Sequence, residues 1–285
     1  MPARLLDGRA LARELREDTI VRVERLRALG IAPRLTVVLA GDDAASHAYA
    51  RSIERAGTAM QIDVTLDVHS THITEAALCA RLHELGDDPD VHGIILQQPL
   101  PAHLGVRRIA EAMPPHKDVD GTNPISLARI AYARDDTFVP ATPMAVMLLL
   151  ERSRHWPLRG VRCCVVGRSS VVGLPVSLLL LGHDATVTIT HRGTRDLGRR
   201  TAEAEVLVAA AGVAGLIRGD MVAPGATVID VGTNYVDGVA VGDVDFAGVA
   251  EVAGEITPVP GGVGPVTNVA LLRNVVTAAE RLIAP

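Results

Sequence analysis

Short apolar runs and amphipathic segments alternate along the first 115 residues of the chain. The runs are rich in Val, Ile and Leu and end in Gly, His or Pro, which is typical of strands. The intervening segments place apolar residues at helical spacing, and Gly30 ends the first of them. Strands are expected over 34–41, 62–69 and 91–101, and helices over 6–30, 46–57 and 74–88. Strands that alternate with helices predict a parallel sheet.

The same alternation restarts near Val161, after two turn-rich breaks at 114–124 and 138–143. Strands are expected over 163–167, 185–190, 205–212 and 226–232, and helices over 144–153 and 173–182. A Gly/Pro-rich loop over 259–268 and an amphipathic helix over 270–284 complete the chain. The pattern therefore predicts an α/β protein built from two units.

Composition supports this fold class and restricts the function. Hydrophobic residues make up 48% of the chain and only six residues are aromatic, so the cores are aliphatic, which suits buried parallel strands. The net charge of −5 argues against nucleic acid as a partner, because a nucleic-acid-binding domain needs a basic surface. The N-terminal segment lacks an apolar signal region, and no apolar run approaches the ~18 residues of a membrane span. We expect a soluble cytoplasmic protein with no membrane partner.

Two residue types are scarce enough to limit the chemistry. Lys117 is the only lysine, so a titratable amine has one candidate, because arginine keeps its proton. The three cysteines, Cys79, Cys163 and Cys164, make no disulfide framework, and the adjacent pair lies in an expected buried strand. The ten histidines are scattered, and we expect no metal site, because zinc needs three or four convergent donors.

The segment VVGRSSVVGLP follows an expected strand and opens an expected helix. Its glycines, Gly167 and Gly173, let the backbone approach a pyrophosphate, whose charge a helix N-terminus favours. The segment departs from GxGxxG, so a plain strand-to-helix turn that binds no ligand explains it equally well. The next strand ends in His191 and Arg192, without the carboxylate that usually binds the ribose of NAD, and Arg168 lies in the loop itself. Two arginines favour the 2′-phosphate of NADP, although they also fit a solvated surface.

Three further segments carry polar residues or glycines at the ends of expected elements. GIILQQPLP ends a strand with Gln97, KDVDG carries Asp118 and Asp120, and PGGVGP spans 260–265. Ligands of open α/β sheets bind at the C-terminal ends of the strands. Taken singly, each of these features is explained at least as well by structure as by function.

Together the motifs are specific. SHAYARS, GIILQQPLP, KDVDG, GRSSVVGLP, GDVDF and TPVPGGVGPVT occur in an order and spacing that resemble the bifunctional methylenetetrahydrofolate dehydrogenase/methenyltetrahydrofolate cyclohydrolase family, the FolD type. The resemblance covers essentially the whole chain and implies two α/β domains around a cleft. A folate-binding catalytic domain over 1–139 plus 270–285 and a Rossmann-like NADP-binding domain over 140–269 are expected. NADP as cofactor, tetrahydrofolate one-carbon derivatives as substrates, a role in one-carbon metabolism and purine biosynthesis, and a homodimer are also implied.

By the same resemblance, the site residues of the family fall on matching positions of this chain. Tyr49 and Gln97 match the catalytic tyrosine and glutamine, and Asp120 matches the aspartate that holds the pterin ring. These three residues also belong to the implied folate site, which a Gly-rich loop flanks. The remaining implied binding positions are Gly261, Gly262 and Pro265 for folate, and Gly167, Arg168, Ser169, Gly173, Arg192 and Thr233 for NADP.

The family has a lysine four residues after the tyrosine, and in this chain that position is Ile53. Hydride departure needs mainly positioning, because the nitrogen lone pairs of the folate drive it. In the hydrolytic step the attacking water must lose a proton, and the family lysine is the group thought to assist. We therefore expect an NADP-dependent methylenetetrahydrofolate dehydrogenase with weak or absent cyclohydrolase activity. Two alternatives stay open: a fully bifunctional enzyme that forms 10-formyltetrahydrofolate, and a catalytically weak folate- or nucleotide-binding protein.

Overall fold

The computed structural model describes residues 2–134 and 136–283, which fold as two compact α/β units. The small-sheet unit comprises Glu14–Ala141 and Asn268–Pro285, and the large-sheet unit comprises Met1–Arg13 and Thr142–Thr267. Both main sheets are parallel, as the alternation of strands and helices predicts. The domain boundaries expected from the sequence stay a prediction. Within the described ranges, no helix combines the length and apolar character that crossing a membrane requires.

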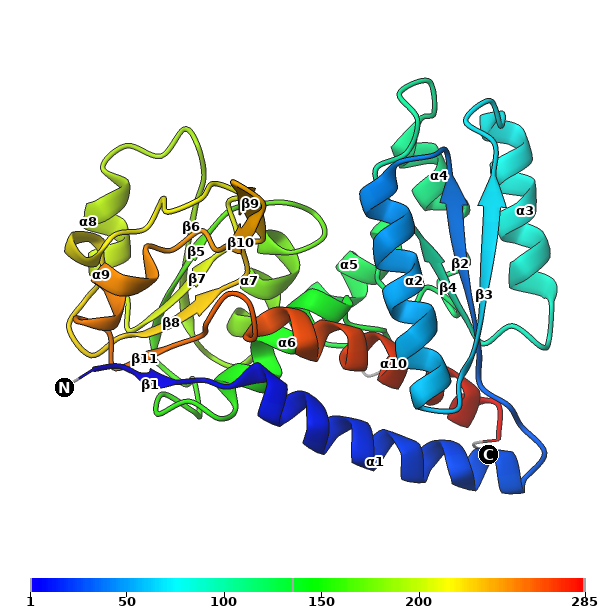
Figure 1. Ribbon diagram of the computed structural model, residues 1–285, viewed down its shortest axis with the longest axis horizontal. Coiled ribbons are helices and arrows are strands. Elements are labelled where there is room, and N and C mark those ends of the chain that lie inside the picture. The colour runs from blue at the N-terminus through cyan, green and yellow to red at the C-terminus, as the bar shows by residue number, and fades with distance from the viewer. Residues whose placement is uncertain (1, 135, 284–285) are drawn as a thin grey trace. The chain divides into compact units, whose positions relative to one another are not determined.

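The small-sheet unit is built on three parallel strands in the order β3-β2-β4 (Figure 1). One face of this sheet packs against α3 and α4 through a cluster of buried aliphatic side chains that includes Val38, Leu82 and Ile109. The strands are β2 (Arg34–Ala40), β3 (Asp63–His69) and β4 (Gly93–Leu96). The helices are α2 (Ala44–Ala59), α3 (Glu75–Asp87), α4 (Val106–Ala112) and α5 (Pro124–Ala131).

The large-sheet unit carries six parallel strands in the order β1-β11-β8-β7-β5-β6, with a separate antiparallel hairpin of β9 and β10. The strands are β1 (Arg4–Leu5), β5 (Arg162–Val166), β6 (Thr186–Thr190), β7 (Val206–Ala209), β8 (Thr227–Asp230), β9 (Asn234–Val236), β10 (Val239–Val241) and β11 (Glu255–Ile256). The helices are α6 (Ala141–Leu150), α7 (Gly173–Gly182), α8 (Leu197–Ala202), α9 (Phe246–Ala250) and the 3₁₀ turn η1 (Gly219–Met221). As predicted, Cys163 and Cys164 are buried in β5, and both are free thiols.

Two long helices, α1 (Gly8–Ala28) and α10 (Val263–Arg281), contribute residues to both units. The sequence predicts that α10 begins only after a loop over 259–268. The structure corrects this boundary, because α10 already begins at Val263 and includes Pro265 in its first turn. Proline fits there, since the first N–H groups of a helix have no partner within the helix.

Candidate functional site

Helix α2 is fixed at its N-terminal end by a side-chain cap. Asp43 accepts hydrogen bonds from the backbone N–H and the hydroxyl of Ser46, both at 2.8 Å. The hydroxyl of Ser46 also lies 3.4 Å from the carbonyl oxygen of Gln98, just beyond β4. The cap therefore places the first turns of α2, which carry Tyr49, beside the segment of Gln97 and Gln98 that follows β4. The side-chain amide of Gln97 donates to the carbonyl of Gln98 at 2.8 Å.

Tyr49 and Ile53 lie one turn apart on α2 but differ in exposure. Ile53 is completely buried and belongs to the stripe of Ser46, Ala50 and Gly57 that faces the protein interior. Tyr49 remains 36% exposed, so it lies at the border between this stripe and solvent. Position 53 is therefore part of the core, and the tyrosine one turn before it is accessible to a ligand.

The KDVDG segment forms a tight turn whose two aspartates have different surroundings. Asp118 is fully buried and accepts hydrogen bonds from Thr122 N, Asn123 N and the hydroxyl of Ser126, at 2.8, 2.8 and 2.6 Å. Asp118 thus fixes the turn. Asp120 is only partly covered and, among the described residues, receives one hydrogen bond, from Ala141 N at 3.0 Å. Its carboxylate therefore retains acceptor capacity for a ligand.

Tyr49 and Asp120 interact electrostatically, so the fold brings these two predicted site residues together. Burial raises the pKa of Tyr49, and the negative charge of Asp120 raises it further. Burial also raises the pKa of Asp120 to about 6, against the lowering effect of the Ala141 hydrogen bond, and Asp118 contributes a smaller increase. At neutral pH the phenol is therefore a hydrogen-bond donor and the carboxylate an acceptor.

Lys117, the only lysine of the sequence, is held at the C-terminal end of α3. Its ammonium group donates to the carbonyl oxygens of Leu85, at 3.1 Å, and Asp88 at the C-terminal end of α3. The residue is buried, and this burial lowers the pKa of the amine. Arg51 and Arg55 also flank position 53 in sequence, but both are exposed, away from the buried stripe of α2.

In the large-sheet unit, the loop after β5 runs directly against the loop after β7. Gly167 has a φ of +125°, and a side chain there would overlap the carbonyl of Ala210. Gly173, the first residue of α7, packs in the same way against the carbonyl of Gly167. Ser169 accepts hydrogen bonds from Val172 N and Gly173 N, at 3.2 and 3.3 Å. The loop is therefore closely packed against its neighbours. Gly167 and Ser169 also line a pocket at the C-terminal end of the sheet.

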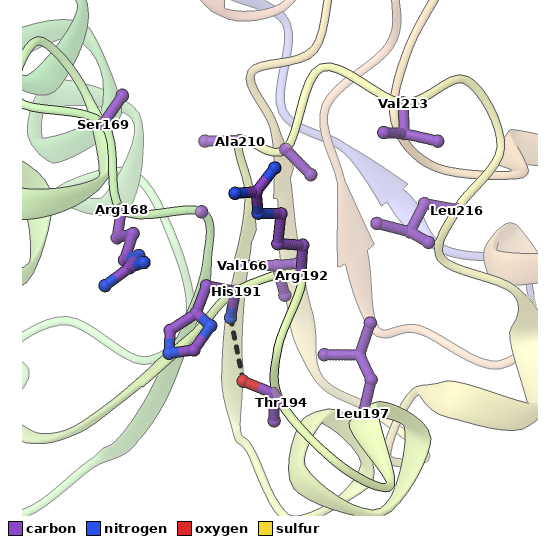
Figure 2. A pocket seen from close by; sticks show the side chains of 12 residues that line it. Val166, Arg168, Ser169, His191, Arg192, Thr194, Leu197, Ala210, Val213 and Leu216 are labelled. Atoms are coloured by element: carbon purple, nitrogen blue, oxygen red, sulfur yellow. Dashed lines mark hydrogen bonds between the residues drawn. The ribbon is translucent and has the colours of Figure 1, made fainter.

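The first pocket of this unit has a volume of about 450 Å³ and opens at the C-terminal ends of β5, β6 and β7. Figure 2 shows Arg168 from the loop after β5, and His191 and Arg192 from the loop after β6. The N–H of His191 donates to the hydroxyl of Thr194 at 2.9 Å, which fixes that second loop. The remaining lining residues are Val166, Gly167, Ser169, Leu197, Ala210, Ala211, Val213 and Leu216. Among the described residues that line this pocket are two guanidinium groups and no carboxylate.

A second pocket in the same unit has a volume of about 250 Å³ and brings Thr233 together with the PGGVGP loop. Gly261, Gly262 and Pro265 all line it, as does Arg9 from the start of α1. A side chain on Gly8 would overlap the carbonyl of Gly262, so α1 begins in direct contact with this loop. Of the predicted binding positions in the large-sheet unit, only Gly173 lines neither pocket.

Among the lining residues that sequence reasoning missed are two groups that no local motif marks. Thr194 and Leu197 follow β6 in the turn that leads to α8, and no motif marks them. Arg9 is separated from the PGGVGP loop by about 250 residues, and only the pairing of β1 with β11 brings it near. A lone arginine in an amphipathic segment gives no signal of this kind.

Residues 6–120 match the catalytic domain of the tetrahydrofolate dehydrogenase/cyclohydrolase family, and residues 140–283 match its NAD(P)-binding domain. The chain belongs to this family. The resemblance of its motifs to the FolD type is thereby confirmed.

Several relatives match over nearly their whole length. The bifunctional protein FolD of Cupriavidus necator is 49% identical over 282 residues, which cover 99% of each chain. The structure of the bifunctional FolD dehydrogenase/cyclohydrolase from Campylobacter jejuni is 39% identical, with a TM-score of 0.96 over 98% of this chain and 99% of that one. The Trypanosoma brucei FolD, solved with NADP and an inhibitor, is 34% identical, with a TM-score of 0.94 and full coverage of both chains.

Proposed function

We propose that the chain oxidises 5,10-methylenetetrahydrofolate with NADP and hydrolyses the methenyl product to 10-formyltetrahydrofolate. Full-length similarity to bifunctional FolD proteins carries this proposal. It favours two activities over the weak or absent cyclohydrolase activity expected from the sequence. The protein would act in one-carbon metabolism and purine biosynthesis, as a cytoplasmic homodimer.

The first pocket fits NADP. Gly167 allows close backbone approach, and α7 directs its N-terminus toward the loop, which suits the pyrophosphate. Arg168 and Arg192 supply positive charge for a 2′-phosphate, and the lining has no carboxylate to select the free ribose of NAD. When bound, NADP supplies a hydride acceptor. Thr233 and the PGGVGP loop would line the nicotinamide and folate side of the same unit.

Residues of the small-sheet unit would orient the folate. Asp120 has free acceptor capacity and would accept hydrogen bonds from the amino-pyrimidine edge of the pterin. Tyr49, kept protonated by its raised pKa, would donate a hydrogen bond beside the one-carbon bridge. Gln97 would position the water that attacks the methenyl carbon. Hydride departure needs only this positioning, whereas the attacking water must also lose a proton.

A dehydrogenase with slow hydrolysis is the second candidate, and one observation favours it. Position 53 is a buried isoleucine, and the only lysine is bonded to the end of α3. No lysine amine among the described residues is therefore available beside Tyr49 to assist water attack. In the second candidate the dehydrogenase rate is normal and the hydrolytic rate is limiting.

One purified sample can separate the candidates. NADPH formation from methylenetetrahydrofolate reports the first reaction, and loss of methenyltetrahydrofolate absorbance, corrected for spontaneous hydrolysis, reports the second. Two comparable rates would establish the bifunctional enzyme, and a fast first step with a slow second one would favour the second candidate. Folate and NADP binding without turnover would identify a binding protein and overturn both.

Replacing Arg192 by alanine should weaken the binding of NADP more than that of NAD. A charge-assisted hydrogen bond contributes about 1.5–3 kcal/mol, so the KM for NADP should rise roughly tenfold or more. The KM for NAD should stay nearly constant, because NAD has no 2′-phosphate. Arg195→Ala in the same loop, outside the pocket lining, is the matched control. Equal losses for NADP and NAD would contradict the assignment of Arg192.

Folate affinity should fall as the pH drops below about 6. Burial raises the pKa of Asp120 to about 6, so its carboxylate gains a proton through this range and loses acceptor capacity. The KM for methylenetetrahydrofolate should rise about tenfold for each pH unit below the pKa. Asp230 in the large-sheet unit also has a pKa raised to about 6, so the Kd of NADP must be followed over the same range. A flat folate KM between pH 7 and 5 would contradict the role of Asp120.

A further inference from the structure

Two buried carboxylates, Asp230 and Asp243, lie in the large-sheet unit, and Asp230 lines the second pocket. Asp243 is fully buried, and Asp230 is 3% exposed at the end of β8. Neither forms an ion pair among residues 2–134 and 136–283. Burying a carboxylate is costly unless its oxygens are fully hydrogen-bonded, so the partners of these two residues indicate what they do.

Asp243 holds the exposed loop that follows β7. Its Oδ2 accepts from Ala211 N at 2.6 Å and Gly212 N at 2.8 Å, and its Oδ1 accepts from Val213 N at 2.9 Å. Three consecutive N–H groups thus converge on one carboxylate, and Gly212 makes this possible with a φ of +68°. Ala211 and Val213 line the first pocket, although both are exposed and have little packing of their own.

Asp243 also contacts the segment that lines the second pocket. Its Oδ1 accepts from the side-chain amide of Asn234 at 2.9 Å, and Gly232 packs so closely on the carboxylate that a side chain there would overlap it. Gly232 and Thr233 line the second pocket, as does Tyr235. One carboxylate therefore joins the backbone of the first pocket to that of the second.

Asp230 fixes Asp243 in turn. Its Oδ1 accepts from Asp243 N at 2.9 Å and Gly232 N at 3.0 Å, and its Oδ2 accepts from Val244 N at 3.1 Å. The segment that carries Asp243 is therefore anchored to the end of β8 in the middle of the sheet. Asp230 therefore holds the backbone of Asp243, and the carboxylate of Asp243 holds the loop over 211–213.

We infer that Asp243 is a positioning residue for the dinucleotide, because its carboxylate holds the loop over 211–213 and the segment at Gly232–Asn234 in one fixed arrangement. The inference rests on the proposed function, in which one NADP molecule uses both pockets. Asp243 acts through backbone that is common to NAD and NADP binding, and it lies outside the arginine-lined part of the first pocket. Removal of the Asp243 carboxylate should therefore weaken the binding of NAD and of NADP equally.

Asp243→Asn tests this inference. Each carboxylate oxygen accepts two hydrogen bonds. In either orientation, the Asn side chain therefore places its NH₂ group against two N–H donors, and both of those hydrogen bonds are lost. The KM for NADP and that for NAD should each rise about tenfold or more, by the same factor. The KM for methylenetetrahydrofolate should stay within about twofold. Asp245→Asn, two residues on at the exposed cap of α9, is the matched control and should leave every KM unchanged.

The readouts separate positioning from a purely structural role. A structural role would lower the Tm and the fraction of active enzyme while leaving the KM of the folded enzyme unchanged, and that result would overturn the inference. If Asp243→Asn does not fold, Asn234→Ala removes a single donor, and the KM for both cofactors should then rise about threefold. An unchanged KM in that variant would also overturn the inference. If the unmodified enzyme binds no NADP by calorimetry, the proposed function fails instead.

Discussion

Replacing Asp120 by alanine should abolish folate-dependent activity while NADP binding persists. The carboxylate is partly covered and receives one hydrogen bond from the part of the chain that the structure describes, which leaves acceptor capacity for two donors on the pterin edge. Two charge-assisted bonds of about 1.5–3 kcal/mol each correspond to a loss of roughly 10²–10⁴-fold in kcat/KM. Both half-reactions should fall together, because both require the same bound folate. Steady-state assays of the two reactions, with calorimetry of NADP, measure this.

Asp120→Asn separates a binding role from a structural one. The folded-state pKa of Asp120 is raised to about 6, so the ionised carboxylate destabilises the folded protein at pH 7. This penalty is complete above the folded pKa and is relieved as the pH falls through it. An uncharged amide that still accepts from Ala141 N should therefore leave the Tm at pH 7 equal or higher while activity is lost. Asp90→Ala, at an exposed loop, serves as the control. Unchanged folate kinetics in Asp120→Ala would make Asp120 a turn residue.

Elements with strong periodicity were predictable from the sequence. The helix that carries Tyr49 and the strand that leads to Gln97 follow from local pattern alone, although that strand ends at Leu96 and not at 101 as expected, and the four strands predicted after Val161 are also present. The short strands β1 and β11 were not predictable, because two residues carry no periodicity and their pairing joins positions about 250 residues apart. The extension of α10 to Val263 was obscured by glycine and proline, which the first turn of a helix tolerates.

The site was only partly predictable, and the reason is physical. Local sequence marks residues that bind ligands through special backbone, such as Gly167, and residue types that carry charge, such as Arg192. It does not tell which carboxylates face a ligand and which face the protein. Asp118 and Asp120 are two residues apart, yet Asp118 fixes a turn, whereas the carboxylate of Asp120 can still accept hydrogen bonds from a ligand. Likewise, only the fold reveals that the amine of Lys117 is bonded to the end of α3.

If hydrolysis is slow, as in the second candidate, introducing an amine at position 53 should accelerate hydrolysis of methenyltetrahydrofolate. Ile53 lies one turn from Tyr49 on the buried stripe of α2, so the stem of a lysine can follow the apolar surface and bring its amine toward the phenol. Burial lowers the pKa of such an amine toward neutrality, where it exchanges protons well. General acid–base assistance is typically worth ~10²–10⁴-fold, and a gain approaching ~10²-fold is expected here. The dehydrogenase step should change little, because hydride departure requires no proton transfer.

The matched control is Ile53→Met, which supplies an unbranched apolar stem without an amine. It should leave hydrolysis unchanged, so that a gain confined to Ile53→Lys reports the amine and not altered packing of α2. A charged group at a completely buried position should also lower the Tm, and both variants need thermal unfolding curves before their rates are compared. The role of position 53 is contradicted if the unmodified enzyme already hydrolyses methenyltetrahydrofolate as fast as it oxidises methylenetetrahydrofolate, and Ile53→Lys leaves that rate alone. Water attack would then rely on Tyr49, Gln97 and solvent, and hydrolysis by this chain would not depend on an amine at position 53.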